Sequence, residues 1–306
     1  MAESVVVIGG GALGTLLATR LERAGHAVAV LVRSAARRES LPREGRSLTV
    51  ETDPTRLPRA ALAFVCVKAR DTESAARAIA ALPAPPPTVC SLQNGWGNLE
   101  TLEAILPGVP LVAGATTIGA YFDASGALHA VTEGGTLLAS WRPGEARGAE
   151  YAAAVLESAG LEVQTRPDAR AVLWRKLTLN AAVNPLTALL DRPNGALLEH
   201  PPLLRVAMAA AGEAALVGIR LGYLPATFDP GPGLESLLHE TRGNRSSMAE
   251  DVARGRPTEA DAILGAAIRA AREAGEKTPV LEALRSMIAA AEGSRAAARA
   301  GETPPA

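Results

Sequence analysis

The sequence predicts an α/β fold: a doubly wound parallel sheet followed by an all-α domain. Short β-branched runs alternate with helical apolar spacing over the first half of the chain, and from about Val172 long helical spacing replaces them. A length of 306 residues with 48% hydrophobic residues is enough to bury two cores. We therefore expect domains at residues 1–167 and 168–292, and a flexible tail at 293–306 that is rich in alanine, arginine and proline.

The first 33 residues follow the order strand, turn, helix, strand. Ser4–Ile8 is a β-branched run typical of a central parallel strand. Residues 15–24 have helical apolar spacing that stops at Gly25, and residues 26–32 form a second apolar run. This order predicts one βαβ unit at the start of the chain.

The turn between the first strand and the helix has the pattern G-x-G-x-x-G, with glycines at Gly9, Gly11 and Gly14. Gly9 permits a tight turn, Gly11 lets the backbone approach a pyrophosphate, and Gly14 lets the helix pack closely on the strand. In this context the motif predicts a Rossmann-type dinucleotide-binding domain.

The end of the second strand indicates which dinucleotide binds. NAD-selective domains commonly have an acidic residue there, whereas this chain has Arg33 and then Ser34. A guanidinium and a hydroxyl suit a 2′-phosphate, and Arg37 and Arg38 could add to the positive field. We expect NADP(H). The alternative is that Arg33 stacks on adenine or is solvated.

Further strands are predicted at 61–67, 88–92, 111–118, 135–139 and 161–163. The first of these ends at Lys68, and the second is followed by Asn94-Gly95. Ligands of doubly wound sheets bind at the carboxyl ends of strands, so we expect Lys68 and Asn94 to face the nicotinamide. Asn94-Gly95 could also be only a tight turn.

A polar stripe marks the beginning of the helical half. Lys176, Asn180 and Asn184 are four residues apart and share one helix face in an otherwise apolar segment. One cation and two carboxamides in this setting indicate a ligand pocket, and a satisfied polar seam between helices is the alternative. Pro185 predicts a kink or break at Asn184, with freed carbonyls.

Two later segments contain helix-start signals. Ser246 or Ser247 is expected to cap a helix, with Glu250 as a capping-box partner. Thr258 is expected to cap the next helix, which makes Glu259 a first-turn acid attracted to the helix dipole. That role does not exclude a carboxylate that points into a binding site.

Taken together, these motifs resemble the ketopantoate reductase (2-dehydropantoate 2-reductase) family over the chain to about residue 290. The motifs occur in the family's order: Gly9-x-Gly-Ala-Leu-Gly14, Val67-Lys68, Gln93-Asn-Gly95, Trp174-x-Lys-x-x-x-Asn180-x-x-x-Asn184-Pro-Leu-Thr187, and Ser246-Ser-Met248 to Thr258-Glu259. The resemblance implies that Lys176 is the general acid and that Glu259 is a catalytic or substrate-orienting carboxylate. It also implies substrate contacts from Asn94, Lys176, Asn180, Asn184, Asn194, Asn244 and Ser247, and cofactor contacts from Gly9, Gly11, Ala12, Leu13, Gly14, Lys68 and Asn94.

The implied reaction is the NADPH-dependent reduction of 2-dehydropantoate to (R)-pantoate on the route to pantothenate and coenzyme A. It needs a hydride from nicotinamide C4 and a proton donor for the developing alkoxide, and burial would adjust the pKa of Lys176 for that task. Two residues leave the identity of the 2-oxo acid undecided: Leu264 stands where the family often has asparagine, and Trp96 is a bulky residue in the Asn-Gly loop. A reductase of another branched or aryl 2-oxo acid, or a non-catalytic NADP(H) sensor, are the alternatives.

Composition limits the other partners. The net charge is −1, which argues against nucleic acid, and no apolar run of about 18 residues lacks a polar interruption. Two cysteines in apolar runs, Cys66 and Cys90, indicate buried thiols in a reducing compartment, and we expect a cytoplasmic protein. None of the four histidines falls in a motif, so no metal site is expected. The alanine-rich helices suit either a core or a homodimer surface.

Overall fold

The computed structural model describes residues 2–41, 48–123, 125–132 and 134–300, with the side chains of Thr132 and 295–300 outside the description, and divides into two compact units. Unit 1 comprises Met1–Gln93 and Gly97–Leu173, and unit 2 comprises Asn94–Trp96 and Trp174–Ala306. One short loop of the N-terminal half, residues 94–96, is therefore part of the helical unit.

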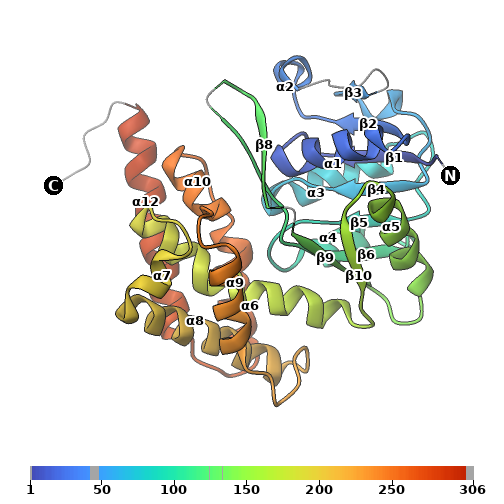
Figure 1. Ribbon diagram of the computed structural model, residues 1–306. Coiled ribbons are helices and arrows are strands. Elements are labelled where there is room, and N and C mark those ends of the chain that lie inside the picture. The colour runs from blue at the N-terminus through green and yellow to red at the C-terminus, as the bar shows by residue number, and fades with distance from the viewer. Residues whose placement is uncertain (1, 42–47, 124, 133, 301–306) are drawn as a thin grey trace. The chain divides into compact units, whose positions relative to one another are not determined.

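Unit 1 is built on an eight-stranded sheet in the order β10-β9-β6-β5-β4-β1-β2-β3 (Figure 1). Neighbouring strands are parallel except for β6 and β9, which are antiparallel. The strands are β1 Ser4–Ile8, β2 Ala27–Leu31, β3 Thr49–Glu51, β4 Leu62–Val65, β5 Val89–Ser91, β6 Leu111–Thr116, β9 Gly135–Ser140 and β10 Glu162–Thr165. The order β3-β2-β1-β4-β5-β6 is that of the Rossmann fold, so the predicted fold class is confirmed.

Burial explains why these runs form strands. Val5, Val6 and Val7 of β1 are fully buried, as expected for a central strand covered on both faces. Its neighbours β2 and β4 are almost as completely buried. The helices of unit 1 are α1 Ala12–Arg23, α2 Ala35–Ser40, α3 Thr72–Ala80, α4 Asn98–Ile105 and α5 Ala146–Ser158, with short 3₁₀ turns at η1 Pro54–Arg56 and η2 Ala69–Asp71. Leucines of α1 and α5 share one hydrophobic core with the strands.

A β-hairpin that the sequence did not predict follows β6. Its strands are β7 Gly119–Phe122 and β8 Leu128–Thr132, and it packs beside α1 (Figure 1). Asp123 organises the turn, because its Oδ1 accepts from the backbone N–H groups of Ser125 (2.8 Å) and Ala127 (3.0 Å). Both strands are partly exposed, which is why no apolar run reveals them.

Helices are the only regular elements among the described residues of unit 2, as predicted. The helices are α6 Ala169–Leu190, which begins in unit 1, α7 Ala196–Glu199, α8 Pro201–Arg220, α9 Pro230–Glu240, α10 Ser247–Ala253, α11 Ala266–Glu273 and α12 Pro279–Ala300, with a π-helical turn at Asp261–Gly265. Helix α12 continues to Ala300, beyond Glu292, where a flexible tail was expected; residues 301–306 lie outside the described residues.

Helix α6 runs through Pro185 without ending, so the predicted break at Asn184 is wrong. The proline ring still removes one backbone donor, and the carbonyl of Ala181 therefore has no N–H four residues later. Packing outweighs this loss, because Ala181, Ala182 and Val183 are buried in the helical core.

By length and composition alone, α8 is apolar enough to cross a membrane. Its alanine-rich face is buried in the core of unit 2, at Ala207, Ala210, Ala211, Ala214 and Ala215. Small side chains there let neighbouring helices approach closely, so the same composition suits a core helix.

Candidate functional site

The glycine-rich turn of unit 1 has the geometry of a pyrophosphate-binding turn. Gly9 has φ +114°, where a side chain would be strained, and a Cβ at Gly14 would lie 2.0 Å from the Gly9 carbonyl oxygen. A Cβ at Gly11, in contrast, would meet no atom nearer than 4.0 Å. The turn is therefore tight at Gly9, closely packed at Gly14 and open at Gly11. These residues fit a dinucleotide pyrophosphate at the N-terminus of α1.

The arginines that follow β2 differ in environment. The guanidinium of Arg33 is mostly exposed and pairs with Asp71 Oδ1 at 3.0 Å. Arg37 instead donates from Nε to the Gly10 carbonyl oxygen at 2.7 Å, and its guanidinium lies 4.3 Å from the ring centroid of Phe122. Burial lowers the pKa of Arg37. Arg37 thus fastens the glycine-rich turn to the hairpin, while Arg33 is the more accessible cation.

The two polar residues predicted at strand ends fall in different units. Lys68 is half-buried after β4, at the start of η2, and belongs to unit 1. Asn94 is half-buried after β5 and belongs to unit 2. The cofactor contact of Lys68 stays a prediction, whereas Asn94 lies among the residues of unit 2.

The polar stripe lies on α6. Lys176 and Asn180 are half-buried, and Asn184 is 7% exposed. Burial lowers the pKa of Lys176 to about 8, and the nearby carboxylate of Glu259 opposes this shift. Lys176 is thus a partly desolvated amine with an acidic neighbour, which is the combination that suits a proton donor near neutral pH.

Glu259 is a buried carboxylate. It is 7% exposed, and its Oε2 accepts a hydrogen bond from Asn94 Nδ2 at 3.2 Å. The preceding Thr258 accepts from the Ala260 N–H at 3.1 Å, as expected of a capping residue. Glu259 is therefore the first-turn acid that the cap predicts, and its carboxylate also points inward. Asn94, Lys176 and Glu259 come together in unit 2 although Asn94 and Glu259 are 165 positions apart.

Asn194 and Asn244 are joined to each other. The Asn194 N–H donates to the Asn244 carbonyl oxygen at 2.8 Å, and Asn194 Nδ2 donates to Thr241 Oγ1 at 2.9 Å. Asn194 is 8% exposed, and its Oδ1 has no hydrogen-bond partner among the described residues. These contacts give both asparagines a structural role beside the predicted substrate contact.

The start of α10 differs from one prediction. Ser246 is the cap, because its hydroxyl accepts from the Ala249 N–H at 3.1 Å. Ser247 is therefore the exposed first residue of the helix, and Glu250 lies one residue too late to complete a capping box. Its carboxylate accepts from Arg245 Nε at 2.9 Å instead. The Ser246 hydroxyl also accepts from Thr187 Oγ1 at 2.8 Å, which fastens α10 to α6.

Sequence reasoning missed an aromatic cluster beside Asn94. The Trp96 ring stacks on Tyr223, with centroids 4.8 Å apart, and meets Trp174 edge-on at 5.0 Å. The chain has only nine Phe, Trp and Tyr residues, so a tryptophan in a glycine-rich loop could have indicated an aromatic contact at this position.

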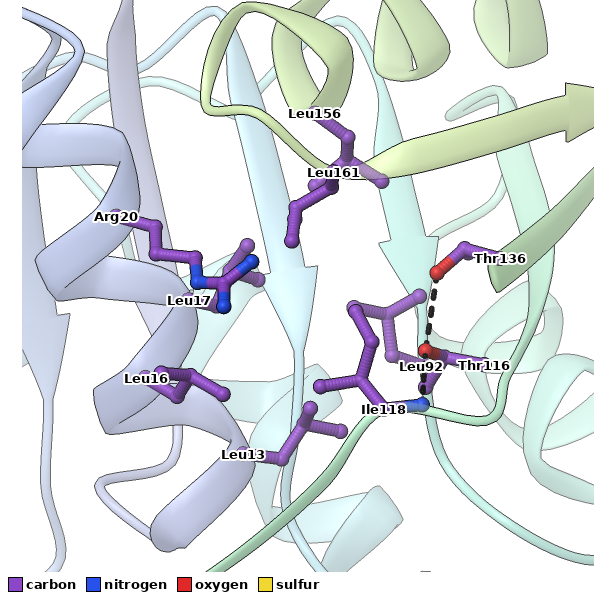
Figure 2. A pocket seen from close by; sticks show the side chains of 10 residues that line it. All are labelled: Leu13, Leu16, Leu17, Arg20, Leu92, Thr116, Ile118, Thr136, Leu156 and Leu161. Atoms are coloured by element: carbon purple, nitrogen blue, oxygen red, sulfur yellow. Dashed lines mark hydrogen bonds between the residues drawn. The ribbon is translucent and has the colours of Figure 1, made fainter. Parts of the chain in front are cut away.

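A small cavity in unit 1 carries no comparable chemistry. Figure 2 shows it lined mainly by leucines, three of which come from α1, with the Thr136 hydroxyl donating to Thr116 Oγ1 at 2.9 Å. Leu13 points into it, so a cofactor contact from Leu13 would come from its backbone. Among the described residues, no group of three or more His, Cys, Asp or Glu side chains could hold a metal ion.

Comparisons with known proteins cover nearly the whole chain. A family model described as "Ketopantoate reductase PanE/ApbA" matches residues 5–143, and one described as "Ketopantoate reductase PanE/ApbA C terminal" matches residues 168–292. A 2-dehydropantoate 2-reductase of Archaeoglobus fulgidus is 34% identical over 295 residues, which are 95% of this chain and 98% of that protein. One of Vibrio cholerae is 32% identical over 95% of this chain and 98% of its own.

Solved structures give the same fold. The PanE/ApbA family ketopantoate reductase from Ralstonia eutropha matches with a TM-score of 0.83 and 27% identity, over 95% of this chain and 99% of its own. A D-mandelate dehydrogenase solved with NADH and anilino(oxo)acetate matches with a TM-score of 0.88 and 22% identity, over 95% of this chain and 99% of its own. The second likeness concerns the fold alone.

Proposed function

Because the chain belongs to the ketopantoate reductase family, we propose that it reduces 2-dehydropantoate to (R)-pantoate with NADPH, on the route to pantothenate and coenzyme A. The observation that carries the proposal is that the half-buried Lys176 lies beside the buried carboxylate of Glu259. The helix that carries Lys176 also presents two asparagines. A proton donor and neutral hydrogen-bonding groups are what reduction of a 2-oxo acid requires besides the hydride.

Lys176 has the central role in this proposal. A nicotinamide, when bound, would supply the hydride for the ketone carbon, and negative charge would then develop on the ketone oxygen. The Lys176 ammonium stabilises that charge and gives the oxygen its proton from Nζ. With its pKa lowered to about 8, Lys176 is charged at neutral pH and still gives up its proton readily.

The neighbouring side chains orient the substrate. Asn180 and Asn184 lie on the same helix face as Lys176, and their carboxamides can both donate and accept hydrogen bonds without cancelling its charge. Glu259 favours the charged form of Lys176. Asn94 donates a hydrogen bond to one carboxylate oxygen of Glu259. We assign Glu259 to tuning Lys176 and to accepting a bond from a substrate hydroxyl.

The preference for NADP(H) is supported by the end of β2. The chain has Arg33 where an acidic residue would bond the ribose hydroxyls of NAD. The exposed guanidinium of Arg33 pairs with Asp71, and a 2′-phosphate offers that cation a stronger, doubly charged partner. The open backbone at Gly11 would hold the pyrophosphate.

A second candidate substrate class is favoured by two side chains. Leu264 is fully buried in the π-helical turn, and Trp96 lies in the same loop as Asn94. Both are apolar and bulky, so a branched or aryl 2-oxo acid is the alternative substrate, with the same proton donor.

The cytoplasm is the proposed location. Cys90 is buried and Cys66 half-buried, both are free, and burial raises the pKa of Cys66 to about 12. Unreactive free thiols fit a reducing compartment. A small 2-oxo acid is the partner that this proposal requires.

The test follows the loss of NADPH absorbance with the purified protein and 2-dehydropantoate, beside NADH and a panel of branched and aryl 2-oxo acids. Turnover fastest with 2-dehydropantoate and NADPH is the expected result. Faster turnover of another acid would move the assignment to the second class. Tight NADPH binding without turnover of any acid would indicate a sensor instead.

A further inference from the structure

The loop Asn94–Trp96, called the 94–96 loop below, is bound to the π-helical turn Asp261–Gly265, called the π-turn below. The Trp96 N–H donates to the Ala262 carbonyl oxygen at 2.9 Å. Two residues before Trp96, Asn94 bonds Glu259, which lies two residues before the π-turn. The loop therefore contacts the segment that carries Glu259 at two points.

The π-turn makes the backbone contact possible. The Ala266 N–H donates to the carbonyl of Asp261, five residues back, and to that of Ile263. In an α-helix the same N–H would bond the carbonyl of Ala262, four residues back. The extra residue in the turn leaves the Ala262 carbonyl to the Trp96 N–H.

Gly95 lets the two backbones approach. Its φ is +89°, and a Cβ there would lie 2.6 Å from the Ala262 carbonyl oxygen and 2.7 Å from the Ala262 side chain. Any side chain at this position would therefore push the 94–96 loop away from the π-turn.

The Trp96 side chain fixes the loop from the other side. Its ring contacts both Tyr223 and Trp174, which also contact each other with centroids 5.4 Å apart. Trp174 is itself fully buried, with its indole N–H donating to the Ala214 carbonyl oxygen at 2.8 Å. The indole thus rests on a rigid base in the helical core, and aromatic pairs of this kind favour one orientation.

We propose that Trp96 is a positioning residue: its indole, held by Tyr223 and Trp174, fixes the 94–96 loop on the π-turn so that Asn94 keeps the Glu259 carboxylate beside Lys176. The inference rests on the proposed function in that Lys176 is the proton donor. It adds that the donor depends on an aromatic anchor that need not touch the substrate. Loss of the indole should release Asn94 and let Glu259 turn toward water, and the charge beside Lys176 would then be lost.

The first test measures the titration of Lys176 without any substrate. The chain has three lysines, Lys68, Lys176 and Lys277, so an amine-acylating reagent and peptide mass spectrometry resolve each one, with exposed Lys277 as the reference. In Trp96→Ala the midpoint of Lys176 acylation should move to lower pH, by as much as in Glu259→Gln. In Trp96→Phe, which keeps a ring on Tyr223, the midpoint should stay near that of the wild type.

The second test is a double-mutant cycle on turnover. Trp96→Ala should lower kcat by about 10- to 100-fold, with the Kd for NADPH within about twofold. In the Glu259→Gln background the same change should have little further effect, because Trp96 acts through Glu259. Tyr223→Leu removes the stacking partner without altering the loop and should reproduce the loss if Trp96→Ala fails to fold.

Trp141→Phe is the matched control. Trp141 is also buried, donates to Glu103 Oε2 at 3.1 Å and lies in unit 1, so its loss should leave the Lys176 midpoint unchanged. An unshifted midpoint in folded Trp96→Ala, or an equal loss of kcat with and without Glu259, would overturn the positioning role. A wild type that turns over no 2-dehydropantoate would overturn the proposed function, and the acylation result would still decide the role of Trp96.

Discussion

The proposed chemistry of this protein depends on the environment of one residue, Lys176. Its position on a polar helix stripe was predictable, because a spacing of four residues places side chains on one face. Its neighbour Glu259 was predicted only through the family resemblance. Capping rules allowed it to face solvent, and the bond from Asn94 that shows its inward position depends on tertiary structure.

If Lys176 is the proton donor, as proposed, its lowered pKa should set the pH dependence of turnover. Reduction requires the ammonium, so kcat/KM for the 2-oxo acid should be level below pH 8 and fall about tenfold per pH unit above it. Oxidation of the hydroxy acid by NADP⁺ requires the neutral amine, so its kcat/KM should rise up to about pH 8 and then level off. Steady-state profiles in both directions measure this.

Two variants check that assignment. Glu259→Gln removes the charge that supports the ammonium, so the break in the reduction profile should move to lower pH. Lys176→Met should abolish the break together with most of the turnover. A break that stays in place in Glu259→Gln would assign the profile to another group.

At the scale of elements, most strands and helices follow from sequence patterns, and the exceptions have physical causes. The central strands of the sheet were found because they are continuous apolar runs, whereas the three-residue strand β3, with only Val50 buried, was missed. The hairpin of β7 and β8 was missed because partly exposed strands with glycine and alanine carry no such run. The π-turn was unpredictable, since its extra residue is stabilised by a bond from a loop far away in the sequence.

Two glycines that flank Trp96 separate backbone strain from close approach. Gly95 and Gly97 have φ values of +89° and +98°, so alanine is strained at both, and this backbone strain should cost roughly 1–2 kcal/mol of stability at each. Only at Gly95 would the new Cβ also collide with Ala262; at Gly97 it meets nothing within 4 Å. Gly95→Ala should therefore lower kcat about 10-fold or more, while Gly97→Ala keeps it.

Thermal unfolding and steady-state kinetics on the same two preparations measure this difference. Comparable losses of kcat in the two variants would mean that strain in the loop, and not the distance to the π-turn, limits turnover.

At the scale of the whole molecule, the division into a sheet unit and a helical unit was predictable from the change in apolar spacing. The membership of the 94–96 loop in the helical unit was not predictable, because no local pattern shows that three residues after a strand pack with distant helices. The proposed cofactor residues at the glycine-rich turn lie in unit 1, whereas the proposed proton donor lies in unit 2. Cofactor preference and pH dependence should therefore vary independently.

Arg33→Ala tests this independence. It removes the cation expected at the 2′-phosphate, so KM for NADPH should rise about 10- to 100-fold, as loss of a charge-assisted hydrogen bond implies, while KM for NADH stays within about threefold. Arg56→Ala, at another exposed arginine of unit 1 whose Nη2 lies 3.7 Å from Glu51, is the control. The break near pH 8 should remain in both variants, because Lys176 and Glu259 are untouched. Equal losses with both cofactors would instead place the Arg33 guanidinium against the adenine, which the two dinucleotides share.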